Sequence, residues 1–183
     1  GADIIDIGGE SSRPGAPEVN VEEELSRVVP LVEKIALKVG VPVSVDTRKA
    51  AVARAAVAAG ACMINDISAL AHDSAMIEAV RDTGAGIVLM HMRGTPGTMQ
   101  AATGYDDVVS EVYAFLDDRV EQCLDVGIDP CSILVDPGIG FGKDLQGNLR
   151  LIRAIGEFSS LGVPVVLGHS RKSFLGAILD TPV

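Results

Sequence analysis

The chain has 183 residues, of which 48% are hydrophobic, and its formal net charge is -10 at pH 7. This composition predicts one globular domain and argues against a disordered chain. Because no run of Lys or Arg stands out and no apolar run approaches the roughly 20 residues needed to cross a bilayer, neither nucleic acid nor a membrane is expected as a partner.

The three cysteines, Cys62, Cys123 and Cys131, form neither a CxxC pair for a metal or redox site nor an even disulfide framework. This favours a reducing, cytoplasmic location. The sequence begins directly on a strand-like run at residues 3–7, without a signal peptide. We therefore expect a fragment that is cut short at both ends.

Six short, almost continuous apolar runs are typical of buried parallel strands. They cover residues 4–7, 41–45, 62–64, 86–90, 133–135 and 163–167. The stretches between them are longer and amphipathic, as at residues 21–39 and 105–126, and indicate helices. Asn20 is placed to cap the first helix, and Glu22 to Glu24 lie near the positive end of its dipole. Strand and helix therefore alternate six times.

Parallel strands connected by helices form either an open doubly wound sheet or a closed barrel. Polar segments follow all six runs, namely GGES, DTR, ND, HMR, DPG and GHSRK. Six strands that all contribute to one edge favour a (β/α)8 barrel, because an open sheet gathers its site around a switch point. We predict an α/β fold, here a partial TIM barrel with about six β/α units, and a single domain over residues 1–183.

The most unusual segment is DPGIGFGK at residues 136–143. Its glycines allow the backbone to approach a ligand closely. Asp136 could accept hydrogen bonds from an amino-pyrimidine, and Phe141 could stack on a planar ring. The alternative is a Gly-rich turn with a solvated Lys143.

A second cluster is GHSRKSF at residues 168–174, where a strand leads into a helix through two cations and two hydroxyls. A helix N-terminus with Arg and Lys side chains is typical of an anion site. Cations at that end oppose the helix dipole, so a purely structural role leaves the arrangement unexplained.

Asp46 and Asn65 each end a strand and could read the edge of a heterocycle together with Asp136, although Asp46 could instead cap the following helix. The loop at residues 8–15 carries Arg13, which could contact a carboxylate or phosphate. A mobile loop without a ligand is the alternative.

His91 has no His or Cys partner at ligand spacing, which disfavours zinc. No Gly-x-Gly-x-x-Gly turn or Gly-x-x-x-x-Gly-Lys-Ser/Thr loop occurs either, which weakens dinucleotide and P-loop interpretations.

Taken in order, the segments GADIIDIGGESSRPGA, SVDT, NDIS, MHMRGTP, DPGIGFGK and GHSRKSF resemble the dihydropteroate synthases, pterin-binding enzymes, over essentially the whole chain. The resemblance implies a (β/α)8 barrel whose second to seventh strands are present here. It implies a folate-pathway transferase that condenses p-aminobenzoate with 6-hydroxymethyl-7,8-dihydropterin pyrophosphate, giving 7,8-dihydropteroate and pyrophosphate. It also implies Mg²⁺ bound with the pyrophosphate, a homodimer and a sulfonamide target.

The resemblance assigns catalytic roles to Asp46, Asp136 and Lys172. The pterin contacts that it implies are Asp46, Asn65, Asp136, Phe141, Gly168 and Lys172. The residues implied near p-aminobenzoate and pyrophosphate are Ser12, Arg13, Pro14 and Ser173. No metal ligand within this chain is implied, because the family's Asn near the metal belongs to a first-strand loop without a counterpart here.

Some features depart from the family pattern. Ser12 stands where Thr is usual, and His169 occupies a position expected to vary. The last strand, with its Arg-x-His anion site, also has no counterpart, so the fragment alone is expected to be inactive. Two alternatives stay open, a methyltetrahydrofolate corrinoid methyltransferase and a non-catalytic pterin-binding barrel. The SRPG and SRKSF segments argue against the first, and the joint presence of Arg13, Asp136 and Lys172 argues against the second.

Overall fold

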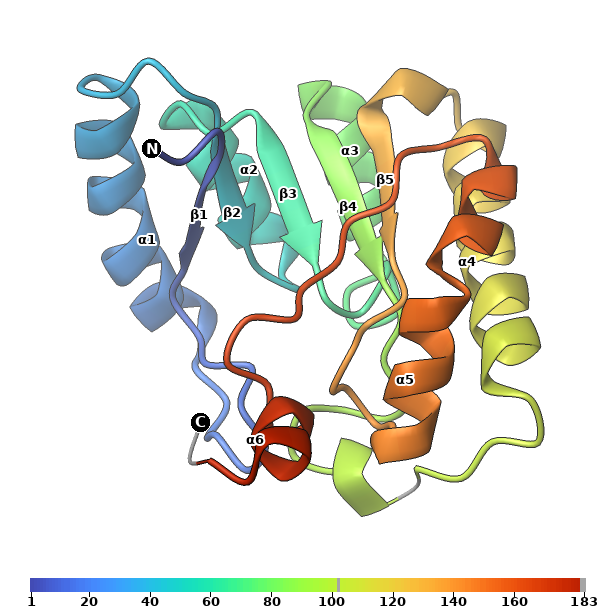
Figure 1. The fold of residues 1–183 in the computed structure, drawn as a ribbon. Helices are drawn as coiled ribbons and strands as arrows, with labels where there is room; N and C mark the ends of the chain where they lie inside the picture. The colour runs from blue at the N-terminus through green and yellow to red at the C-terminus, as the bar shows by residue number, and fades with distance from the viewer. Residues whose placement is uncertain (102, 182–183) are drawn as a thin grey trace.

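A computed structural model describes residues 1–101 and 103–181. Its centre is one sheet of five parallel strands in the sequential order β1-β2-β3-β4-β5 (Figure 1). The strands are β1 (Ile5–Gly8), β2 (Val43–Asp46), β3 (Met63–Asp66), β4 (Gly86–Met90) and β5 (Ile133–Asp136). Five of the six predicted strands are thus confirmed. Their sequential parallel order is that of a barrel, whereas a doubly wound sheet reverses its order at the switch point.

The sixth predicted strand, at residues 163–167, is wrong as a regular strand. Val165 forms only an isolated parallel bridge with Val135. Two backbone hydrogen bonds hold the segment beside β5, from Val135 N to Pro164 O (3.0 Å) and from Val166 N to Val135 O (2.8 Å). Pro164 has no N–H to contribute to a ladder, which weakens pairing at this point. The segment still takes the position that a sixth strand would occupy.

Helices connect the strands, and Figure 1 shows α1 to α5 arranged around the outside of the curved sheet. They are α1 (Val21–Ala36), α2 (Ala50–Ala58), α3 (Met76–Thr83), α4 (Val108–Asp125) and α5 (Leu145–Arg153). A short helix, α6 (Ser173–Leu179), lies near the carboxyl ends of the strands. The described residues also form three 3-10 segments, η1 (Met99–Ala101), η2 (Pro130–Ser132) and η3 (Ile155–Leu161). No helix among the described residues is long and apolar enough to cross a membrane.

The first helix begins where the sequence predicts. The side-chain oxygen of Asn20 accepts a hydrogen bond from the Glu23 N–H at 2.8 Å, which satisfies one of the free donors at the helix start. Val28 and Val32 then face the sheet and are almost completely buried. This combination of cap and apolar stripe fixes both the start and the orientation of α1.

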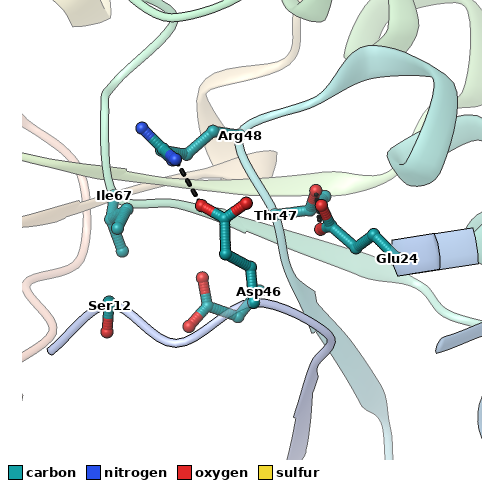
Figure 2. Close-up of a pocket in the computed structure, with 7 residues that line it drawn as sticks. Ser12, Glu24, Asp46, Thr47, Arg48 and Ile67 are labelled. Atoms are coloured by element: carbon teal, nitrogen blue, oxygen red, sulfur yellow. Dashed lines mark hydrogen bonds and ion pairs between the residues drawn. The ribbon is translucent and has the colours of Figure 1, made fainter. Parts of the chain in front are cut away.

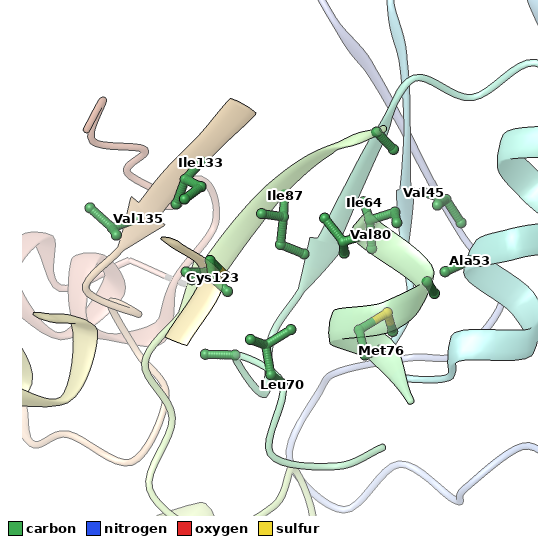
Figure 3. Packing of buried hydrophobic residues seen from close by; sticks show 14 of the residues in the cluster. Val45, Ala53, Ile64, Leu70, Met76, Val80, Ile87, Cys123, Ile133 and Val135 are labelled. Atoms are coloured by element: carbon green, nitrogen blue, oxygen red, sulfur yellow. The ribbon is translucent and has the colours of Figure 1, made fainter. Parts of the chain in front are cut away.

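The hydrophobic core lies between the sheet and its helices. Figure 3 shows Ile64 and Ile87 from neighbouring strands packed against Met76 and Val80 of α3. All four side chains are at most 1% exposed. Burying an Ile, Val or Met side chain contributes about 1.5–3 kcal/mol each, so this layer stabilises the fold strongly. The core therefore holds the strands rigidly while their carboxyl ends are left to polar residues.

Candidate active site

Polar side chains from three strands meet at the carboxyl edge of the sheet. Asp46 ends β2 and pairs in register with Asn65 of β3, while Gly8 of β1 pairs with Asp46 on its other side. Residues in register on parallel strands point to the same face. Asp136 ends β5 and pairs with Met90. The predicted placement of Asp46, Asn65 and Asp136 at one edge is confirmed.

The Asp46 carboxyl lies in an unfavourable environment for a negative charge. Burial raises its pKa to about 7, and the neighbouring carboxylates of Asp6, Asp66 and Glu24 act in the same direction. Asp6 also accepts a long hydrogen bond from the Asn65 amide, with 3.4 Å between Nδ2 and Oδ2. Near neutral pH, Asp46 can therefore present either a protonated or an ionised carboxyl to a ligand.

Asp136 is buried and is oriented by its own loop. Its Oδ1 accepts a hydrogen bond from the Gly138 N–H at 2.7 Å. Burial raises the pKa of this carboxyl, while the N–H groups of Gly138 and Gly168 and the Lys172 ammonium oppose the increase. Predicted site residue Gly168 thus lies against the Asp136 carboxyl. Asp136 is a hydrogen-bond acceptor held in one orientation.

Phe141 and Lys172 form one unit, although they come from different loops. The Lys172 ammonium lies 4.0 Å from the centre of the Phe141 ring, within the range of a cation–π interaction. Burial lowers the pKa of Lys172, and the carboxylates of Asp136 and Asp46 raise it. A side chain at Gly140 would have its Cβ 3.0 Å from the Lys172 Cδ, so glycine leaves room for this packing. The two predicted residues are brought together.

A cleft of about 770 Å³ opens beside this unit. Its lining includes the predicted residues Ser12, Arg13, Pro14, Phe141, Lys172 and Ser173. It also includes Gly140 of the DPGIGFGK segment, Ser170 and Arg171 of the predicted anion cluster, and two residues outside every predicted motif, Met99 and Gln100. Arg171 has φ of 51°, an uncommon conformation for a side-chain residue that is enriched at functional sites. No motif pointed to Gln100, whose side chain donates to the Gly140 carbonyl at 3.2 Å.

Asp46 faces a smaller pocket next to this cleft. Figure 2 shows Asp46, Ser12 and Ile67 around it. Ser12 lines both the small pocket and the large cleft. The loop that leaves β1 therefore connects the Asp46 side of the site with the Phe141 side. The loop also reaches the loop that follows β4, because the Gly15 N–H donates to the Pro96 carbonyl at 3.4 Å.

A buried ionic network supports the start of this loop. Glu10 binds the Arg48 guanidinium and the Lys49 ammonium, the latter at 2.6 Å. Lys49 also binds Glu24 at 2.5 Å, and Glu24 accepts from the Thr47 hydroxyl at 2.6 Å (Figure 2). These ion pairs and hydrogen bonds hold the pKa of Glu10 down at about 2, although burial acts in the opposite direction.

The sequence motifs do not predict this network. Glu24 lies in the first turn of α1, as a helix-start acid should, but its side chain is only 1% exposed and binds Lys49 and Thr47. An acidic residue on the same helical face as Val28 and Val32 was the available signal.

The alternative of a solvated Lys143 is wrong, because this side chain is only 4% exposed. Its ammonium lies inside the loop that follows β5 and contacts His91 Nδ1 at 2.9 Å. Burial, together with the Lys143 charge, lowers the pKa of His91 to about 3, so His91 is neutral. Within residues 1–101 and 103–181, no three His, Cys, Asp or Glu side chains gather to hold a metal ion.

These features agree with the comparisons to known proteins. Residues 1–183 match the family model described as "Pterin binding enzyme". The chain belongs to the pterin binding enzyme family.

Named members of the pterin binding enzyme family are similar over the whole chain. The dihydropteroate synthase of Escherichia coli K12 is 48% identical over 98% of this chain, which spans 64% of that protein. The Yersinia pestis dihydropteroate synthase, solved with a sulfonamide drug complex, is 46% identical with a TM-score of 0.96, over 100% of this chain and 66% of that one. The Xanthomonas albilineans dihydropteroate synthase, solved with 4-aminobenzoic acid, is 48% identical with a TM-score of 0.94. The match covers 100% of this chain and 64% of that one. The partial-barrel prediction is thereby confirmed.

Proposed function

We propose that this chain is part of a dihydropteroate synthase, a folate-pathway transferase that joins p-aminobenzoate to 6-hydroxymethyl-7,8-dihydropterin pyrophosphate. One observation carries the proposal: the Ser12–Pro14 loop and the Phe141–Lys172 unit line a single cleft. Similarity to named dihydropteroate synthases supports it, although the chain spans slightly less than two thirds of the E. coli relative.

The pterin is proposed to bind at the strand ends. Asp136, oriented by the Gly138 N–H, would accept hydrogen bonds from the amino-pyrimidine edge. Asn65 offers both donors and acceptors, and Asp46 can do so when protonated. Phe141 and Lys172 would contact the flat face of the ring, and the Gly168 backbone lies beside Asp136.

The proposed reaction is a substitution at the pterin methylene carbon. The amine nitrogen of p-aminobenzoate forms a bond to this carbon, and the carbon–oxygen bond to pyrophosphate breaks with its electron pair leaving on oxygen. The amine then loses a proton to solvent. Positive charge that develops on the pterin would be stabilised by the Asp46 and Asp136 carboxylates, which are held in place before reaction. Lys172 is their counterion at the same site.

The second substrate is proposed to occupy the cleft under the β1 loop. Arg13 could pair with the carboxylate of p-aminobenzoate or with the leaving pyrophosphate, because a guanidinium binds either bidentately. Ser12, Pro14 and Ser173 line the same cleft. Because the Yersinia pestis relative was solved with a sulfonamide drug complex, we propose that sulfonamides compete at this position.

Mg²⁺ is proposed to accompany the pyrophosphate and to neutralise charge on the leaving group. The described residues do not fit a metal site of their own, since no three candidate ligands gather there. We assign no step to the metal through this chain. A homodimer, a cytoplasmic location and a single domain over residues 1–183 complete the proposal.

The corrinoid methyltransferase is the second candidate, because a pterin site alone suits both enzymes. The cleft favours the synthase, since Arg13, Arg171 and Lys172 place three cations around a space beside the pterin position. A methyl transfer from a folate has no leaving pyrophosphate that would require them. A non-catalytic barrel leaves the same cations without a role.

The test incubates the complete protein with p-aminobenzoate, the pterin pyrophosphate and Mg²⁺ and follows dihydropteroate by mass spectrometry. Dihydropteroate that is formed by the unmutated protein but not by the Asp136→Asn variant supports the proposal. A well-folded protein that binds pterin but forms no product would instead favour the methyltransferase or a non-catalytic barrel.

A further inference from the structure

The loop after β5 has an internal cation that the proposed reaction does not use. The Lys143 ammonium donates to the carbonyl oxygens of Gly138 and Phe141, both at 2.9 Å. It also contacts the His91 carbonyl at 3.2 Å and His91 Nδ1 at 2.9 Å. One buried side chain therefore joins two points of its own loop to the residue that follows β4.

This loop lacks the hydrogen bonds of regular structure. Gly138, Gly140 and Gly142 have positive φ values of 70°, 85° and 65°, conformations that glycine adopts without strain. Within the loop, the Phe141 N–H bonds to the Gly138 carbonyl at 3.1 Å. From outside, Asn148 of α5 accepts from the Gly140 N–H at 2.7 Å. Lys143 adds the contacts that fix the loop against β4.

The location of the contacts connects Lys143 to the site. Phe141 is both a residue whose carbonyl Lys143 binds and the residue whose ring lies under the Lys172 ammonium. Removing the donor would take the Lys143 hydrogen bond from the buried Phe141 carbonyl, at about 1–3 kcal/mol if that oxygen stays unsatisfied, whereas the Gly138 carbonyl keeps the Phe141 N–H. A loop rich in glycine would relieve this cost by rearranging, and the Phe141 ring would move with it.

We propose that Lys143 is a positioning residue for the pterin, because its ammonium ties Gly138 and Phe141 to the end of β4 and so fixes the Phe141 ring in the cleft. The inference rests on the proposed function, since it takes the ring to be the pterin contact. Burial lowers the pKa of Lys143 to about 7, with Arg93 and Lys172 acting in the same direction and Asp136 opposing them. Near neutral pH the group is therefore partly neutral, and it keeps N–H donors for the two carbonyls in either form.

The test measures binding of 6-hydroxymethylpterin to the complete protein by calorimetry. Lys143→Met keeps an unbranched side chain that is one atom shorter and has no donors, and Lys38→Met changes an exposed lysine as the control. We expect Lys143→Met to weaken binding at least tenfold and Lys38→Met to leave it unchanged. In the Phe141→Ala background, Lys143→Met should have no further effect beyond about twofold, because residues acting through one another are not additive.

The outcomes separate the two proposals. Unchanged pterin affinity in a folded Lys143→Met, or a double variant whose loss is the product of the single losses, overturns the positioning role alone. No binding by the unmutated protein overturns the pterin site and this inference with it. If Lys143→Met does not fold, the crystal structure of the unmutated protein with 6-hydroxymethylpterin decides. Nζ farther than about 3.5 Å from both carbonyl oxygens would then reject the role, and retained contacts would support it.

Discussion

Glu10 and Lys49 form an ion pair, with 2.6 Å between Oε2 and Nζ, that joins the start of the β1 loop to the residue before α2. The Glu10 side chain is 11% exposed and the Lys49 side chain is 10% exposed. Lys49 forms a second ion pair with Glu24, and Glu10 forms a second ion pair with Arg48. The position of Ser12 and Arg13 therefore depends on charges that never face the cleft.

We expect Glu10→Gln to destabilise the protein by about 3 kcal/mol, because it leaves two buried cations with one carboxylate fewer. Denaturant unfolding measures this change. Glu18→Gln is the matched control, since Glu18 also approaches Arg48, at 3.9 Å, but its side chain is 66% exposed. The control should change stability by less than about 0.5 kcal/mol. Equal effects of the two variants would show that burial of the network is energetically unimportant.

Asp46 gives a prediction about pH. Its pKa is about 7 in the folded chain and has the ordinary value of 3.8 in the unfolded chain. As pH rises, the unfolded chain therefore loses this proton at a lower pH than the folded chain does. Stability from this group is therefore greatest at low pH and falls as pH rises from about 4 to about 7. Asp46→Asn should remove that loss and raise the free energy of unfolding at pH 8 by roughly 2 kcal/mol, after allowing for partial exposure of the side chain. Its melting temperature at pH 4 should match that of the unmutated protein, and a gain of the same size at both pH values would contradict the assignment.

Asp136→Asn should weaken pterin binding about 10- to 100-fold and leave the fold intact, because one acceptor is replaced by an amide in a fixed orientation. Calorimetry with a pterin and a melting curve measure both quantities. Asp117→Asn on the exposed face of α4 is the control and should affect neither. Pterin affinity that survives in Asp136→Asn would remove this carboxylate from the proposed site.

Gly138→Ala should be far more damaging than its small size suggests. A Cβ at this position would lie 1.9 Å from the His91 carbonyl oxygen, and the backbone has a positive φ of 70°. We expect a loss of about 3 kcal/mol in stability from backbone strain and overpacking together. Gly156→Ala is the control, because a Cβ there meets no atom within 4 Å. Thermal melts compare the two, and similar melting temperatures would indicate a loop that adapts freely.

Local patterns predicted much of this structure because the relevant interactions are local or repeat along the chain. Apolar runs located β1 to β5, and Asn20 marked the start of α1. The meeting of Asp46, Asn65 and Asp136 followed from parallel topology, since the carboxyl ends of parallel strands share one edge. The Glu24–Lys49 pair did not follow, because no periodic pattern relates a helix acid to a cation in the next β/α unit.

The same limit explains Lys143 and the sixth apolar run. Whether a lysine at a loop end is solvated or buried depends on which carbonyls the folded loop directs at it, here including one that follows β4. Whether an apolar run becomes a strand also depends on its backbone donors, and residues 163–167, which include Pro164 without an N–H, make only one isolated bridge.

The hydrogen bond between Gly15 and Pro96 joins two loops that lie far apart in the sequence. It connects the loop of the first strand, which lines the cleft, to the loop of the fourth strand, so a shift of one loop is transmitted to the other. A substitution near Pro96 would then change how firmly Arg13 is held over the position proposed for p-aminobenzoate. Selection with an inhibitor that competes for this position should recover variants in both loops, although the two lie far apart in the gene.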